Sequence, residues 1–125
     1  MAKLLIVEDD EAVRRGLEGL LSVIGGHEVR AMVTAEAALS AIKADPPQLI
    51  ITDVKLPGFS GIHLVEVVRE NPEWKHIPFL VISASITTQT ERHIAGLEGV
   101  TYLRKPFDPE TLQEAVATVL AATQV

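Results

Sequence analysis

Short apolar runs alternate along the chain with segments of helical periodicity, and this alternation constrains the fold more than any other feature. Three runs are uninterrupted by polar residues, at 4–7, 49–51 and 79–82. A weaker run covers 100–103, and a marginal one covers 28–32. Uninterrupted apolar runs of this length are typical of strands that are covered on both faces, as in a parallel sheet.

Between these runs, apolar residues recur at spacings of three and four, which indicates amphipathic helices. The first stripe is predicted to stop at a Gly-Gly pair and consists of Val13, Leu17, Leu20, Leu21 and Ile24. Thr34, Ser60 and Asp108 are predicted N-caps, and a weaker fourth helix is expected near 89–97. Five repeats of strand and helix with short connections predict a doubly wound parallel α/β sheet.

Length and composition narrow the class of protein. A chain of 125 residues predicts one domain, residues 1–125. The absence of cysteine excludes disulfides and thiolate metal sites, and it favours the cytoplasm. The net charge of −6 argues against direct nucleic-acid binding. No apolar run approaches the length of about 20 residues that a membrane span needs.

The predicted strand ends carry polar residues, and ligands of such sheets bind beyond the carboxyl ends of the strands. Three acids at 8–10 follow the first strand, and the later strands lead to Asp53, Ser83 and Lys105. Carboxylates gathered at one edge repel one another unless a proton or a cation intervenes, and Mg²⁺ is a suitable cation. A carboxylate nucleophile, a metal, a hydroxyl and a lysine are the parts that phosphoryl transfer to a carboxylate needs.

Taken singly, each of these residues also has a structural interpretation. Asp9 and Asp10 precede a helix, where an acid caps free N–H groups and suits the helix dipole. Asp53 begins a turn-like sequence, the hydroxyl of Ser83 could bond to nearby backbone, and Lys105 could be solvated. Only the residues taken together indicate phosphoryl transfer.

Four motifs occur in order along the chain: Ile-Val-Glu-Asp-Asp at 6–10, Asp-Val-Lys-Leu-Pro-Gly-Phe-Ser-Gly at 53–61, Val-Ile-Ser-Ala at 81–84 and Tyr-Leu-Arg-Lys-Pro-Phe at 102–107. Spacings of 43, 30 and 22 residues separate Asp10, Asp53, Ser83 and Lys105. With these motifs, the whole chain resembles the receiver domains of two-component response regulators, including the single-domain chemotaxis kind. The resemblance implies a flavodoxin-like five-stranded sheet in the order 2-1-3-4-5.

The resemblance implies a phosphoryl acceptor and a metal site. Asp53 would accept a phosphoryl group from a sensor histidine kinase or a histidine phosphotransfer protein. Asp10 would bind Mg²⁺ together with the Asp53 carboxylate and the backbone carbonyl of Lys55, and Asp9 would contribute directly or through water. The chain would then be a switch that catalyses only its own phosphorylation and dephosphorylation, and not a metabolic enzyme.

The resemblance also implies a response to phosphorylation. Lys105 would pair with one phosphoryl oxygen, and Ser83 would hydrogen-bond another once phosphate is present. Tyr102 would swing from an exposed to a buried position, and the Lys105–Pro106 peptide would be cis. An effector protein would bind the face formed by the fourth helix, fifth strand and fifth helix.

Three other functions compete with this interpretation. A flavodoxin-like cofactor binder is disfavoured because acids at 8–11 would repel a bound phosphate. A phosphohydrolase of the haloacid-dehalogenase type would need a second acid where Lys55 stands. A receiver-like module that binds proteins without being phosphorylated remains the alternative. The sequence also leaves open whether the chain is a whole protein or part of a longer regulator.

Overall fold

The computed structural model describes residues 2–56, 58, 60–84 and 87–123. In this part of the chain the strands are β1 (Lys3–Val7), β2 (Glu28–Met32), β3 (Leu49–Asp53), β4 (Phe79–Ser83) and β5 (Val100–Arg104). The helices are α1 (Glu11–Gly19), which continues as the π-helical segment η1 (Leu20–Ile24), α2 (Ala35–Ala44), α3 (Gly61–Glu70), α4 (Thr88–Ala95) and α5 (Pro109–Thr123).

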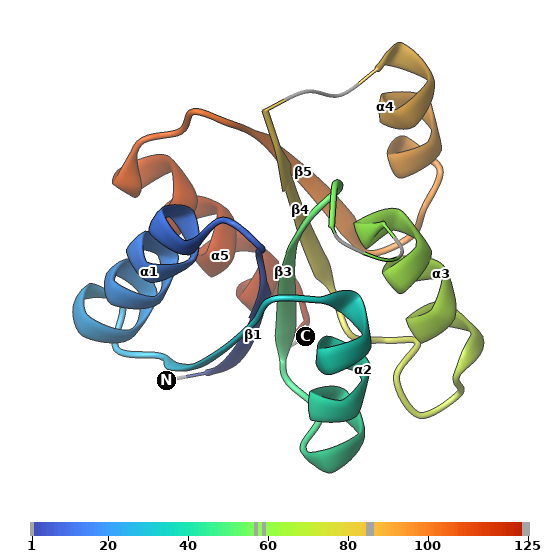
Figure 1. The fold of residues 1–125 in the computed structure, drawn as a ribbon, viewed down its shortest axis with the longest axis horizontal. Helices are drawn as coiled ribbons and strands as arrows, with labels where there is room; N and C mark the ends of the chain where they lie inside the picture. Colours follow the sequence, from blue (N-terminus) through green and yellow to red (C-terminus); the bar gives the residue numbers. More distant parts are fainter. Residues whose placement is uncertain (1, 57, 59, 85–86, 124–125) are drawn as a thin grey trace.

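The strands form one parallel sheet in the order β2-β1-β3-β4-β5. Helices α1 and α5 cover one face, and α2, α3 and α4 cover the other (Figure 1). The doubly wound architecture and the strand order are therefore confirmed. The direction of winding reverses between β1 and β3, so a ligand is expected at the carboxyl ends of these two strands.

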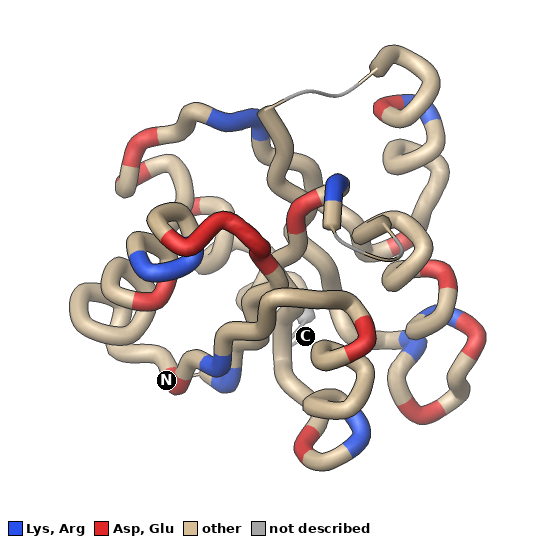
Figure 2. Tube along the Cα trace, in the orientation of Figure 1, with Lys and Arg blue, Asp and Glu red and all other residues tan. Residues whose placement is uncertain are grey.

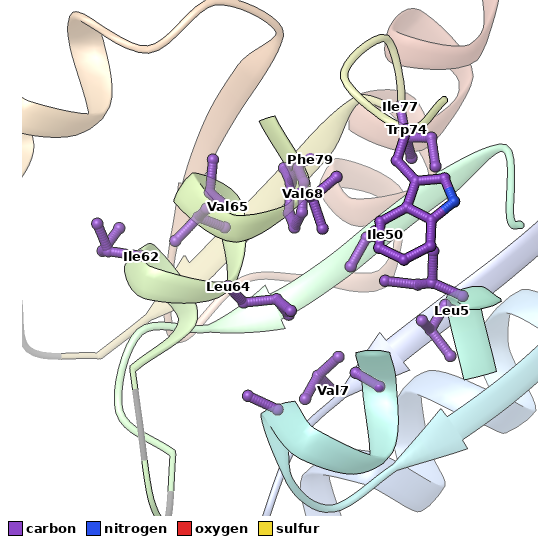
Figure 3. Packing of buried hydrophobic residues seen from close by; sticks show 14 of the residues in the cluster. Leu5, Val7, Ile50, Ile62, Leu64, Val65, Val68, Trp74, Ile77 and Phe79 are labelled. Atoms are coloured by element: carbon purple, nitrogen blue, oxygen red, sulfur yellow. The ribbon is translucent and has the colours of Figure 1, made fainter. Parts of the chain in front are cut away.

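The core has two halves because successive strand side chains point to opposite faces of the sheet. In β1, Leu5 and Val7 pack toward α2, α3 and α4, whereas Leu4 and Ile6 pack toward α1 and α5. Figure 3 shows the first half, which also contains Trp74. Full burial of a Leu or Ile side chain contributes about 1.5–3 kcal/mol, so this alternation fixes which face each strand residue occupies.

The predicted helix caps are confirmed. Each cap accepts a hydrogen bond from the backbone N–H three residues later: Ala37 to Thr34 at 3.1 Å, His63 to Ser60 at 3.2 Å and Thr111 to Asp108 at 2.8 Å. The weak fourth helix also forms, and Thr87 caps it by accepting from the N–H of Thr90. The short polar side chains therefore set where these helices begin.

The first helical segment stops at Ile24, directly before the Gly-Gly pair as predicted, but its last residues leave the buried stripe. Ile24 was placed on the buried face, but it is 70% exposed, and the neighbouring Val23 is 82% exposed. The cause is the π-helical geometry of η1, in which the N–H of Gly25 bonds to the carbonyl of Leu20, five residues back. This wider turn moves the last residues off the stripe that Leu21 still occupies.

Within the described residues, the structure contains no helix of the length and apolar character that a membrane crossing requires. The cytoplasmic location inferred from the composition stays a prediction.

His27 links the start of the chain to the turn before β2, and this contact generates a pH-dependent prediction. Its Nδ1 accepts the backbone N–H of Ala2 at 3.2 Å, and burial lowers its pKa below the usual 6.5. Below about pH 6.5 the unfolded chain therefore binds this proton more readily than the folded chain, and stability falls. In His27→Asn, an amide oxygen that does not titrate in this range can accept the same N–H.

We expect urea unfolding at pH 7.5 and pH 5 to show a larger loss of unfolding free energy for the wild type than for His27→Asn. Equal losses in the two proteins would contradict this role for His27.

Candidate functional site

The carboxyl ends of β1 and β3 bring two acids together. Val7 pairs with Thr52 in the parallel register, so the next residues along the two strands are Glu8 and Asp53. Glu8 also follows Leu4 and Ile6 in the alternation of side chains, which directs it toward the α1 and α5 side of the sheet. Its side chain is completely buried, while that of Asp53 is 13% exposed.

Lys105 joins these two acids. Its Nζ lies 2.6 Å from Oε1 of Glu8 and 2.9 Å from Oδ2 of Asp53. Its backbone N–H donates to the carbonyl of Ser83 at 2.9 Å, which holds the segment after β5 against the end of β4. The Lys105–Pro106 peptide is cis, as predicted.

The electrostatics of the site reflect burial opposed by ion pairing. Burial raises the pKa of Glu8 above its usual value, and the charge of Asp53 adds to the effect, while Lys105 acts against it. For Lys105, burial acts to lower the pKa, but its bonds with Glu8 and Asp53 outweigh burial and raise it. Lys105 is thus stabilised as a cation. Ionisation of the Glu8 carboxyl group, in contrast, is costly because the group is buried.

A third acid completes a group that could hold a cation. Within the described residues, Glu8, Asp9 and Asp53 each present a carboxylate oxygen, and these oxygens lie within 4.8 Å of one another. Figure 2 shows the acidic run after β1 beside the end of β3. Carboxylate oxygens are the donors preferred by hard divalent cations, so the residues fit such an ion. Lys105 balances at most one of the three negative charges.

Asp10 is directed toward α1 and does not belong to the cluster of Glu8, Asp9 and Asp53 that could hold a cation. Its Oδ1 accepts the N–H of Val13 at 3.0 Å and caps α1, which confirms the capping interpretation for this residue. The inward position belongs to Glu8, an acid for which the sequence alone indicated no role. The two acids differ because Glu8 directly follows the last residue of β1, whereas Asp10 is the N-cap of α1, where the strand alternation no longer applies.

Asp53 is held by the loop that follows it. Its Oδ1 accepts the N–H of Lys55 at 3.2 Å, and the N–H of Gly61 returns to the carbonyl of Val54 at 2.9 Å. A Cβ at Gly61 would collide with the carbonyl oxygen of Asp53, so only glycine permits this close return. Pro57 and Phe59 of the expected acceptor loop lie outside the described residues.

Ser83 and Tyr102 lie on the neighbouring strands. Ser83 ends β4 and is 2% exposed, and Lys105 is bonded to its carbonyl. Tyr102 lies in β5 opposite Val81, is half-buried, and donates its hydroxyl hydrogen to the Ser83 carbonyl at 3.5 Å. The structure therefore places Asp9, Asp53, Ser83 and Lys105 at the carboxyl edge of the sheet, with Tyr102 on the neighbouring strand β5, and the roles of these residues stay predictions.

Comparison with known proteins identifies relatives that align with most of this chain. The family described as the response regulator receiver domain matches residues 4–117. The chain is 34% identical to chemotaxis protein CheY-3 of Vibrio cholerae, over 90% of this chain and 86% of that protein. It is 36% identical to response regulator protein FleR of Pseudomonas aeruginosa, where it spans 93% of this chain but 24% of that protein.

Solved structures of response regulators share the fold of this chain. The chemotaxis response regulator CheY4 of Vibrio cholerae superposes with a TM-score of 0.86 at 28% identity, covering 95% of this chain and 98% of that one.

The raised pKa of Glu8 predicts that this acid costs stability. A folded pKa above the usual 4.5 means that ionised Glu8 destabilises the fold at neutral pH, and that the cost disappears as pH falls through that window. We expect Glu8→Gln to raise the Tm at pH 7, with the gain shrinking toward pH 4.5. The exposed Glu66 on α3 provides the control, as Glu66→Gln. A Glu8→Gln variant less stable than the wild type at pH 7 would contradict this account.

Proposed function

This chain belongs to the response regulator receiver family, and we propose that it is a phosphorylation switch whose acceptor is Asp53. One observation carries the proposal: the Asp53 carboxylate lies 2.9 Å from the ammonium of Lys105 and beside two further acids at the end of the sheet. Receiver domains are signalling switches and not metabolic enzymes. We take residues 1–125 as one such domain.

The proposed reaction moves a phosphoryl group from a histidine of a sensor kinase or phosphotransfer protein to Asp53. A carboxylate oxygen of Asp53 forms the new O–P bond while the N–P bond breaks, and the bonding electron pair returns to the imidazole nitrogen. Lys105 already contacts Oδ2 of Asp53, so it is positioned to offset charge on the phosphoryl oxygens. Catalysis of this kind rests on positioning and on charge neutralisation.

Mg²⁺ is the cofactor proposed for this step. Glu8, Asp9 and Asp53 would hold it, directly or through water, and the resemblance to receivers adds the backbone carbonyl of Lys55. When bound, the ion supplies positive charge that neutralises the phosphoryl oxygens. Asp10 is not proposed as a ligand, because its carboxylate caps α1.

We further propose that the signal leaves through the face formed by α4, β5 and α5. A groove of about 530 Å³ lies between α4 and β5, and its lining residues include Thr88, Glu91, Ile94, Val100 and Tyr102. Tyr102 connects this groove to the site through the Ser83 carbonyl. A phosphoryl group that engages the Ser83 hydroxyl would change the end of β4 and thereby the position of Tyr102.

The output partner depends on the rest of the protein. The chain spans about a quarter of the length of FleR but most of the length of CheY-3. We propose an effector protein bound at the α4–β5–α5 face, since the acidic net charge of −6 disfavours direct contact with nucleic acid.

The acceptor assignment is tested by intact-protein mass spectrometry after incubation with acetyl phosphate, with and without Mg²⁺. We expect a mass increase of one phosphoryl group that requires Mg²⁺ and is absent in Asp53→Asn. Because some receivers accept phosphate only from their kinase, purified phosphohistidine protein is the second donor. No transfer from either donor would favour the alternative of an unphosphorylated binding module.

The switch is tested by hydrogen exchange with and without phosphorylation. We expect deuterium uptake of α4 and β5 to change on phosphorylation in the wild type and in Ser83→Thr, because both retain a hydroxyl. In Ser83→Ala, Asp53 is expected to be phosphorylated while α4 and β5 keep the uptake of the unmodified protein. Identical uptake with and without phosphate in the wild type would refute the proposed route.

A further inference from the structure

Arg14 in α1 contacts the turn that carries two of the three acids. Its Nη1 donates to the backbone carbonyl of Glu8 at 3.2 Å and, at the longer distance of 3.5 Å, to that of Asp9. Its own backbone N–H donates to the carbonyl of Asp10 at 2.9 Å. One residue therefore bonds to three consecutive carbonyls between β1 and α1.

These contacts place a positive charge and hydrogen-bond donors against a turn that carries several acids. Carbonyl oxygens carry partial negative charge, and the carbonyls of Glu8 and Asp9 lie within the acidic segment that follows β1 (Figure 2). A guanidinium offers several donors in a rigid plane, so it can satisfy two adjacent carbonyls while keeping its charge. The half-buried Arg14 thus fixes the backbone from which the carboxylates of Glu8 and Asp9 project.

The next residue provides a contrast. Arg15 carries the same charge but forms only a surface ion pair, Nη2 to Oε1 of Glu11 at 2.8 Å, with both side chains more than 60% exposed. Exposed pairs of this kind contribute little to stability. The two arginines therefore separate the effect of a nearby positive charge from the effect of bonds to the turn.

We propose that Arg14 is a positioning residue for the cation site, and that it raises the affinity for Mg²⁺ by holding the turn that bears Glu8 and Asp9. The inference rests on the function proposed above. Partners that orient metal ligands without touching the metal affect affinity by about 10–100-fold in other proteins. Because Arg14 acts through backbone carbonyls, we expect the lower end of that range.

Charge alone predicts the opposite sign, which makes the proposal testable. Removing a positive charge near three acids would strengthen cation binding, whereas loosening the turn would weaken it. The Mg²⁺ dissociation constant is measured by NMR titration of backbone amides in the wild type, Arg14→Gln, Arg14→Lys and Arg15→Gln. We expect about tenfold weaker binding in Arg14→Gln, with unchanged or slightly tighter binding in Arg15→Gln.

Arg14→Lys keeps the charge but replaces the planar guanidinium, whose Nη1 makes both contacts, with a tetrahedral ammonium, and we expect an affinity between those of the wild type and Arg14→Gln. This variant also serves if Arg14→Gln fails to fold. A second readout is the initial rate of phosphorylation by acetyl phosphate, for which the half-saturating Mg²⁺ concentration should rise while the rate at saturating Mg²⁺ is retained.

Binding in Arg14→Gln and Arg14→Lys as tight as in Arg15→Gln would overturn the role of Arg14 and leave the proposed function intact. A wild type that does not bind Mg²⁺ would overturn both.

Discussion

The contact between Lys105 and the two acids Glu8 and Asp53 is the interaction on which the rest of the site depends. Isolated buried carboxylates are costly, and the distances of 2.6 and 2.9 Å show that one ammonium serves both. The strands that bring these groups together are fixed by apolar side chains on both faces of the sheet. The packed sheet thereby holds together charged side chains that come from the ends of three different strands.

The three acids outnumber the single lysine, so the site carries an excess of negative charge. This excess favours binding of a cation. Three carboxylates face one lysine, so a further cation or a proton is favoured at the edge of the sheet. A phosphoryl group on Asp53 would alter the same balance, because it adds charge where Lys105 already lies. The bonds of Ser83 to Lys105 and to Tyr102 then offer a physical connection from the site to the groove beside α4.

Much of the fold could be predicted because apolar runs and polar caps act locally. The buried runs became strands within one or two residues of the predicted bounds, and Thr34 and Ser60 cap helices as expected. The Gly-Gly stop after Ile24 was predicted, but the exposure of Ile24 was not, because a π-helical turn changes the period itself.

The site was predicted as a set of residues but not in its detailed assignment. Acids in one run look equivalent in a sequence, and the choice between Glu8 and Asp10 depends on where β1 ends and α1 begins. Asp10 lies where α1 begins, and its carboxylate caps that helix. The contact of Arg14 with the turn depends on how α1 packs. It could therefore not be predicted from a local sequence pattern.

The most direct test of the account is the unfolding free energy as a function of Mg²⁺ concentration for the wild type, Asp9→Asn and Asp10→Asn. Each variant removes one charge, and asparagine still caps a helix well, so the pair differs mainly in the place of the lost carboxylate. A bound ion at 100 times its dissociation constant stabilises a fold by about 2.7 kcal/mol. The account predicts that Asp10→Asn keeps the Mg²⁺-dependent gain of the wild type and that Asp9→Asn loses most of it. Loss in Asp10→Asn with retention in Asp9→Asn, or no gain in the wild type, would contradict it.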